Sequence, residues 1–125
     1  MSGWQGDLVK QFDALAERAV LQQKFAIVAY LMSRIVQYSP VDTGAFRSNH
    51  RLAASVTKEQ LPINESPADV VKRAEEAVAA VPVFETVYIQ NSLPYAVALE
   101  NGHSKQAPDG VYKVAVNDTI ERFKR

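Results

Sequence analysis

The sequence predicts an α+β fold: a long N-terminal helix, a small, mostly antiparallel sheet, a middle helix, a short helix and a C-terminal helix. Three observations lead to this prediction. Residues 7–38 contain neither Pro nor Gly. The run 83–90 is dense in the β-branched and aromatic residues that favour strands. Helix start signals recur at Ser66 and Pro108. A chain of 125 residues fits a single domain spanning 1–125.

The first helix should run from Asp7 to Tyr38, as one long helix or two abutting ones, and end at Ser39-Pro40 because the residue before proline avoids helical geometry. With about 3.6 residues per turn, its apolar positions fall on two nearly opposite faces. One face holds Leu8, Phe12, Leu15 and Ala19, and the other holds Leu21, Phe25, Val28, Met32 and Ile35. Two interpretations remain open: a straight helix whose first stripe is an interface, or a kinked helix with both stripes in one core.

The later elements follow from shorter patterns. A weak strand is expected over 46–56, with Phe46, Leu52, Ala54 and Val56 on one side. Ser66 and Pro67 open a helix that Pro82 ends near residue 81, and a strand then covers 83–90. A short helix over 94–100 ends at Asn101-Gly102, and Pro108 starts a last helix. The expected apolar face of that last helix consists of Tyr112, Val116, Ile120 and Phe123.

Composition excludes several classes of function. There is no Cys, so thiol nucleophiles and thiolate metal sites are excluded, and 14 basic residues balance 14 acidic ones. Charge is uneven along the chain: 7 basic and 4 acidic residues up to residue 58 give +3, 2 and 7 over 59–102 give −5, and 5 and 3 afterwards give +2. Neither a signal pattern nor an uninterrupted apolar run of about 18 residues is evident, so we expect a soluble intracellular protein without a membrane partner.

The tetrapeptide Asp42-Thr43-Gly44-Ala45 is the one in which retroviral-type aspartic proteases carry their catalytic carboxylate. Such an enzyme needs two carboxylates across a two-fold axis on strand-supported loops, and this sequence offers about two strands. The alternative is a turn between helix and strand, in which Pro40 fixes one dihedral angle, Asp42 and Thr43 bond local amides and Gly44 takes a positive φ. The turn is the favoured interpretation, and an aspartic protease using Asp42 is the enzymatic alternative.

The remaining chemical candidates are weaker. His50, Glu100 and His103 have no metal-site spacing, so solvated or interface histidines are expected, with no metal and no cofactor. None of the serines lies in a nucleophile-elbow context. Arg47, Arg51 and Lys58 could contact phosphates, but without interleaved aromatic residues they read as a solvated face. A small nucleic-acid-binding module using Arg47 and Arg51 is therefore a second alternative, and we expect no enzyme.

Two stretches together resemble a known family. They are "SPVDTGAFRSN" (39–49) and "VYIQNSLPYAVALENGHSKQAPDGVYKVAV" (87–116). Their ordered features are similar to those of tailed-bacteriophage minor tail proteins, also called tail-completion or head–tail joining (neck) proteins. The matching positions of the second stretch include Asn91, Pro94, Tyr95, Gly102 and Pro108. Residues 51–81 follow no signature of that family.

The resemblance implies a non-enzymatic virion protein of a phage or prophage, located in the tail or head–tail junction and in the host cytoplasm during assembly. It implies a homo-oligomeric ring, expected to be a hexamer, of subunits that can be monomeric alone. The implied partners are portal-side connector proteins and tail-terminator or tail-tube proteins, with DNA passing nearby without sequence-specific binding. Subunit or partner contacts are expected at Leu8, Phe12, Leu15, Glu100, His103, Lys105 and Gln106.

Overall fold

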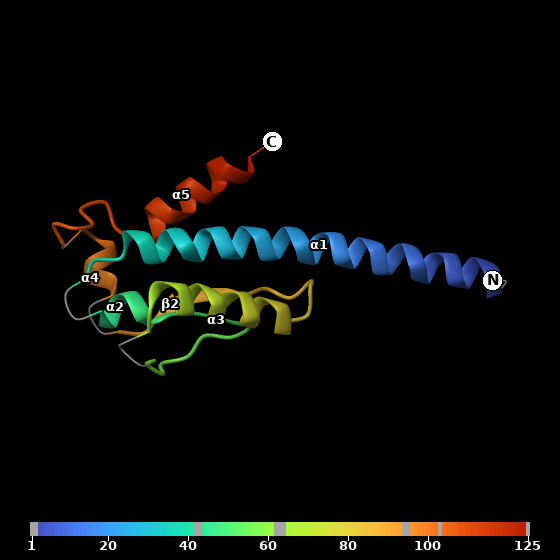
Figure 1. The fold of residues 1–125 in the computed structure, drawn as a ribbon, viewed down its shortest axis with the longest axis horizontal. Helices are drawn as coiled ribbons and strands as arrows, with labels where there is room; N and C mark the ends of the chain where they lie inside the picture. Colours follow the sequence, from blue (N-terminus) through green and yellow to red (C-terminus); the bar gives the residue numbers. More distant parts are fainter. Residues whose placement is uncertain (1–2, 42–43, 62–64, 94–95, 103, 125) are drawn as a thin grey trace.

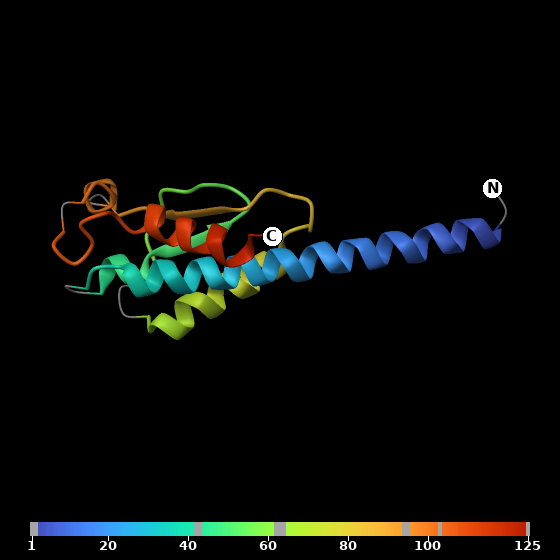
Figure 2. The ribbon, with the colours of Figure 1, turned by 90° about the horizontal axis from the view of Figure 1, so that it is seen from above.

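The computed structural model describes residues 3–41, 44–61, 65–93, 96–102 and 104–124, and within them the side chains of 3–9, 12 and 97 are not described. Its α+β architecture confirms the predicted fold class. Helix α1 (Gly3–Tyr38) is one continuous helix of 36 residues that runs the length of the molecule (Figure 1). The body of the protein surrounds only its C-terminal half, where α3 (Pro67–Ala80) and α5 (Tyr112–Phe123) pack against it (Figures 1 and 2).

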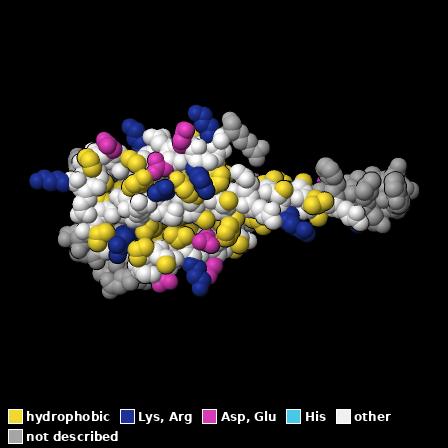
Figure 3. Space-filling model, turned by 45° about the horizontal axis from the view of Figure 1, so that its top comes forward, with side chains coloured by type: hydrophobic (Ala, Val, Ile, Leu, Met, Phe, Trp, Pro, Cys, Tyr) yellow, Lys and Arg dark blue, Asp and Glu magenta, His cyan; other side chains and the backbone are white. Residues whose placement is uncertain are grey.

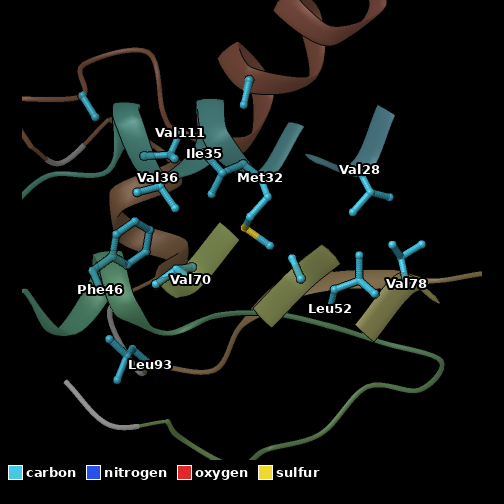
Figure 4. Close-up of a cluster of buried hydrophobic side chains, with 13 residues drawn as sticks. Val28, Met32, Ile35, Val36, Phe46, Leu52, Val70, Val78, Leu93 and Val111 are labelled. Carbon is cyan, nitrogen blue, oxygen red and sulfur yellow. The ribbon is translucent and has the colours of Figure 1, made fainter. Parts of the chain in front are cut away.

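The hydrophobic core forms between that half of α1, helix α3 and the sheet (Figure 4). Val28, Met32 and Ile35 of the second predicted stripe are buried, whereas its first two members, Leu21 and Phe25, are partly exposed. Leu15 and Ala19 of the first stripe are exposed. The kinked interpretation, with both stripes in one core, is therefore wrong for these two residues.

The sheet has two antiparallel strands, β1 (His50–Ala53) and β2 (Tyr88–Asn91), with His50 opposite Asn91. Both strands are shorter than predicted. Residues 45–48 form a helical turn, α2 (Ala45–Ser48), because Gly44 takes φ 87° and the Ser48 hydroxyl donates to the Gly44 carbonyl at 2.6 Å. Residues 83–85 form a turn rather than a strand, since the Glu85 amide donates to the Pro82 carbonyl, and 86–87 are irregular.

The helices after β1 begin and end at recognisable signals. Ser66 caps α3 as predicted, its hydroxyl accepting the Asp69 amide at 3.2 Å. Helix α4 (Ala96–Glu100) is followed by Gly102 at φ 84°. Helix α5 begins at Tyr112 rather than at Pro108, because Gly110 takes φ 86° and breaks the chain direction there.

The buried face of α5 also differs from the prediction. Val111, Ala115 and Thr119 are buried, whereas Val116 and Ile120 of the predicted apolar face are exposed. Small residues allow α5 to lie close to α1, and the Thr119 hydroxyl is satisfied by the Ala115 carbonyl at 2.7 Å. Tyr112 and Phe123 of the predicted face are partly buried, so the prediction was wrong for Val116 and Ile120 only.

One segment of α1, Asp13–Tyr38, is long and apolar enough to cross a membrane by length and composition, with a mean hydropathy of 1.2. This corrects the expectation that no segment reaches that length. The same segment supplies Val28, Met32, Ile35 and Val36 to the core, and the core helix of a soluble protein satisfies the same criterion.

Candidate functional site

A cluster of buried and partly buried polar side chains connects the end of α1, both strands and the start of α5. It consists of Ser39, His50, Asn91 and Tyr112 and is called the joint below. Its centre is His50, whose side chain is 0% exposed, contrary to the solvated or interface position expected from the sequence. The imidazole Nε2 lies 2.7 Å from the Ser39 hydroxyl, and Nδ1 lies 3.0 Å from the Tyr112 hydroxyl. The Phe46 ring packs edge-on against the imidazole. The end of α1, α2, β1 and the start of α5 therefore meet at one side chain.

The hydrogen bonds assign the protonation of His50. The Ser39 hydroxyl has one proton, which it donates to the Ile35 carbonyl at 2.6 Å, so Nε2–H of His50 must donate to Ser39. Nδ1 then accepts from Tyr112. Burial, followed by the nearby charge of Arg73, lowers the His50 pKa to about 3. Burial, with a smaller contribution from Glu100, raises the pKa of the Tyr112 phenol. The joint is thus neutral and satisfied at neutral pH.

The Ser39–His50 pair has the spacing of a nucleophile and its general base, but not the required direction of hydrogen bonding. A general base must accept the serine proton, whereas here the imidazole donates to Ser39. Both side chains are also buried, so a substrate carbonyl has no approach to the serine oxygen. The arrangement can position segments and exclude water, which is a structural role.

Asn91, one of the positions that resemble the phage family, belongs to this joint. Its amide nitrogen donates to the Phe46 carbonyl at 2.8 Å, and its amide oxygen accepts the Leu93 amide at 3.1 Å. On the other side of β1, Arg73 donates to the His50 carbonyl at 2.7 Å and forms an ion pair with Glu65. Asn91 therefore ties β2 to α2 and sets the turn that leads toward α4.

Glu100, predicted as an interface residue, has its carboxylate engaged within the subunit. Its oxygens accept the amides of Val111, Tyr112 and Lys113 at 2.8, 2.7 and 2.9 Å. These amides belong to the first turn of α5, where no intrahelical partner is available and negative charge is favourable. Its assignment to an interface stays a prediction, but the residue has a defined structural use.

The glycine after α4 is required by this same connection. At φ 84°, a Cβ on Gly102 would lie 2.4 Å from the Pro108 carbonyl oxygen, far inside van der Waals contact. The bend at Gly102 allows 104–110 to fold back so that Glu100 reaches the start of α5. Gly102 and Pro108, both family-like positions, therefore shape one structural loop.

We expect Glu100→Ala to lower the free energy of unfolding by about 1–3 kcal/mol, because three first-turn amides lose a charged acceptor. Urea denaturation of the purified variant measures the change. Glu121→Ala is the matched control: it removes an exposed acidic residue of α5 and should change stability by less than about 0.5 kcal/mol. Equal effects of the two substitutions would contradict the capping role.

The turn after α1 is held by another predicted interface residue. The side-chain amide of Gln106 bonds both backbone groups of Val41, its oxygen accepting the Val41 amide at 2.9 Å and its nitrogen donating to the Val41 carbonyl. Pro40 precedes this contact and Gly44 follows it with the predicted positive φ. Asp42 and Thr43, like Pro94, Tyr95 and His103, lie outside the described residues. Lys105 is exposed, so its charge is accessible to a partner.

The projecting part of α1, residues 3–20, is called the arm below. It leaves the body as a single helix (Figures 1 and 3). Every described side chain from Lys10 to Val20 is exposed, and Leu15 is 63% exposed. The side chains of Leu8 and Phe12, predicted to share its apolar stripe, lie outside the described ones. The arm is the largest feature of the molecule that has no partner among the described residues.

The geometry gives little support to the two alternative functions, an aspartic protease and a nucleic-acid-binding module. The sheet has two short strands in the described part of the chain, too few to support the paired loops of an aspartic protease. Arg51 pairs with Glu59 at 3.4 Å, and the Arg47 side chain is partly buried, so these residues are not a freely solvated basic face. No cluster of metal-ligating side chains occurs among the described residues.

Comparisons with protein-family models, curated proteins and solved structures found no match to this chain.

Proposed function

We propose that this chain is a non-enzymatic structural subunit that acts by assembly, as part of the head–tail junction or tail end of a tailed phage or prophage. The observation that carries the proposal is the arm. An isolated helix of its length is marginal in water, and its stability in proteins comes from packing an apolar face. An exposed helix with Leu15 and Val20 on its surface is suited to a partner.

The family-like residues support the same proposal because their observed roles are structural. The family-like Asn91 and Gly102 hold backbone segments in place through hydrogen bonds or backbone geometry, and so do the neighbouring Glu100 and Gln106. A rigid body with a projecting helix is suited to assembly, because the body positions the helix for contact with a partner. The ring, the connector and tail-tube partners and the passage of DNA rest on the resemblance described above.

Deletion of the gene from the strain that carries it, followed by prophage induction, tests this proposal. The expected lysate contains DNA-filled heads and separate tails but few joined particles, and a plasmid copy of the gene restores joining. Negative-stain electron microscopy counts the three kinds of particle. Normal numbers of joined particles in the deletion lysate would overturn the proposal.

A further inference from the structure

An apolar groove lies where the arm leaves the body, between α1 and residues 83–87. It has a volume of about 700 Å³, within the range of pockets that receive ligands or side chains. Val20, Ile27 and Leu31 form its α1 wall, and Phe84 and Val87 form much of the opposite wall. Phe84 is 71% exposed and Val20 is 40% exposed, so both walls present apolar surface to solvent.

The opposite wall is fixed to α1 by Lys24. Its ammonium group donates to the Val83 carbonyl at 3.2 Å and to the Glu85 carbonyl. The turn at 83–85 is thereby tied to α1 beside the groove. These two hydrogen bonds fix the position of the opposite wall relative to α1.

The arm of the same molecule cannot fill this groove. Helix α1 is continuous, so the arm extends away from the body along the helix axis (Figure 2). Leu15 and Ala19 also lie roughly a third of a turn around the axis from Val20 and Ile27, given about 3.6 residues per turn. One chain therefore carries a projecting apolar stripe and an apolar groove that face different directions.

The charges beside the two surfaces are complementary. Arg18 borders the apolar stripe of the arm, and Glu85 lines the groove. Lys24, the cationic residue in the groove lining, has its ammonium group bonded to the Val83 and Glu85 carbonyls. Arg18 and Glu85 are exposed, and neither has an ion-pair partner among the described residues. A stripe inserted into the groove can bring the two charges together at the rim, which favours this orientation over the reversed one.

We infer that the groove receives the arm of a second copy of this chain. The inference rests on the proposed assembly role and names its contact: the Leu15 stripe of one subunit inserts beside Phe84 of the next. Because the two surfaces differ, the contact is heterologous and leaves a free arm and a free groove at the ends of any short chain of subunits. Such contacts close into rings when the rotation permits.

Disulfide trapping tests this contact directly, because the protein has no native Cys. Full-length Leu15→Cys and Phe84→Cys variants are mixed under oxidising conditions, and the cross-linked dimer is followed on non-reducing gels. The matched control mixes Leu15→Cys with Val56→Cys, since Val56 is 69% exposed, like Phe84, but lies away from the groove lining. Trapping captures transient association, so the protein need not form stable rings unaided.

The Leu15/Phe84 mixture should cross-link about tenfold faster than the control mixture, because docking raises the effective concentration of the two thiols. Adding Glu85→Arg to the Phe84→Cys chain should slow that reaction, and adding Arg18→Glu to the Leu15→Cys chain should restore it. Equal rates for the two mixtures, or no restoration by the paired charge reversal, would overturn the inference. Either result leaves the gene-deletion phenotype unaffected, so failure of this contact is distinguishable from failure of the proposed function.

Discussion

Replacing His50 by leucine should lower the free energy of unfolding by about 2–4 kcal/mol, although leucine is apolar and the site is fully buried. The loss arises because the Tyr112 hydroxyl, now without its nitrogen acceptor, stays largely buried. The Ser39 hydroxyl also loses the donor on its second side. Chemical denaturation of the purified variant measures the change.

A second substitution separates this explanation from simple loss of packing. Tyr112→Phe in the His50→Leu background removes the unsatisfied hydroxyl, so the double variant should be more stable than His50→Leu alone. In the native background, the same Tyr112→Phe change should be destabilising. If Tyr112→Phe is equally destabilising in both backgrounds, the hydroxyl and the imidazole are not coupled and the joint described above is wrong.

Acid should destabilise the native protein more than the His50→Leu variant. The His50 pKa is about 3 in the folded protein, against 6.5 for an ordinary histidine, so the unfolded chain binds a proton first as pH falls. The contribution of neutral His50 is fully present above pH 6.5 and is lost progressively toward pH 3. At about 1.36 kcal/mol per pH unit, the 1.5 units between pH 6.5 and 5 remove about 2 kcal/mol.

Denaturation curves at pH 7 and pH 5 for both proteins give this difference. The native protein should lose about 2 kcal/mol more than the variant over that interval. NMR supplies an independent check, since one of the two histidine ring signals should stay at its neutral position down to pH 4.5. Parallel stability changes in the two proteins, or titration of both rings near pH 6.5, would contradict a buried neutral His50.

The sequence predicted the elements that local signals determine. The long proline-free run became α1, and Ser66 with Pro67 marked the start of α3 correctly. The α+β class and the antiparallel pairing were also confirmed. These features depend on residues within a few positions of one another, which is the information that periodicity and capping patterns contain.

Features that depend on distant residues were missed. The strand expected at 46–56 begins only at His50, because Ser48 and Asn49 bond backward to the carbonyls of α2. The start of α5 depends on Glu100, eleven residues before the first amide it binds. The sequence predicted a solvated or interface position for His50 because its neighbours Asn49 and Arg51 are polar. A possible signal was the presence of Ser39, Asn91 and Tyr112, three side chains able to satisfy an imidazole.

The contact residues predicted from the sequence stay predictions, but the structure shows the surroundings of several of them. Leu15 is exposed, as an interface stripe requires. Glu100 and Gln106, predicted as contact residues, have hydrogen-bond partners within the subunit. The groove beside Phe84 was not foreseen, since residues 83–87 were expected to be strand. It arises from the Lys24 contact across about sixty residues, which no local pattern reveals.

The composition of purified joined particles tests the central claim most directly. Quantitative mass spectrometry, calibrated with isotope-labelled peptides of this chain, measures its copy number relative to the major capsid protein. The account predicts that the protein is present in joined particles at the small, fixed number expected of one closed ring, about six copies. Absence of the protein from joined particles, or a copy number comparable with that of the capsid protein, would contradict it.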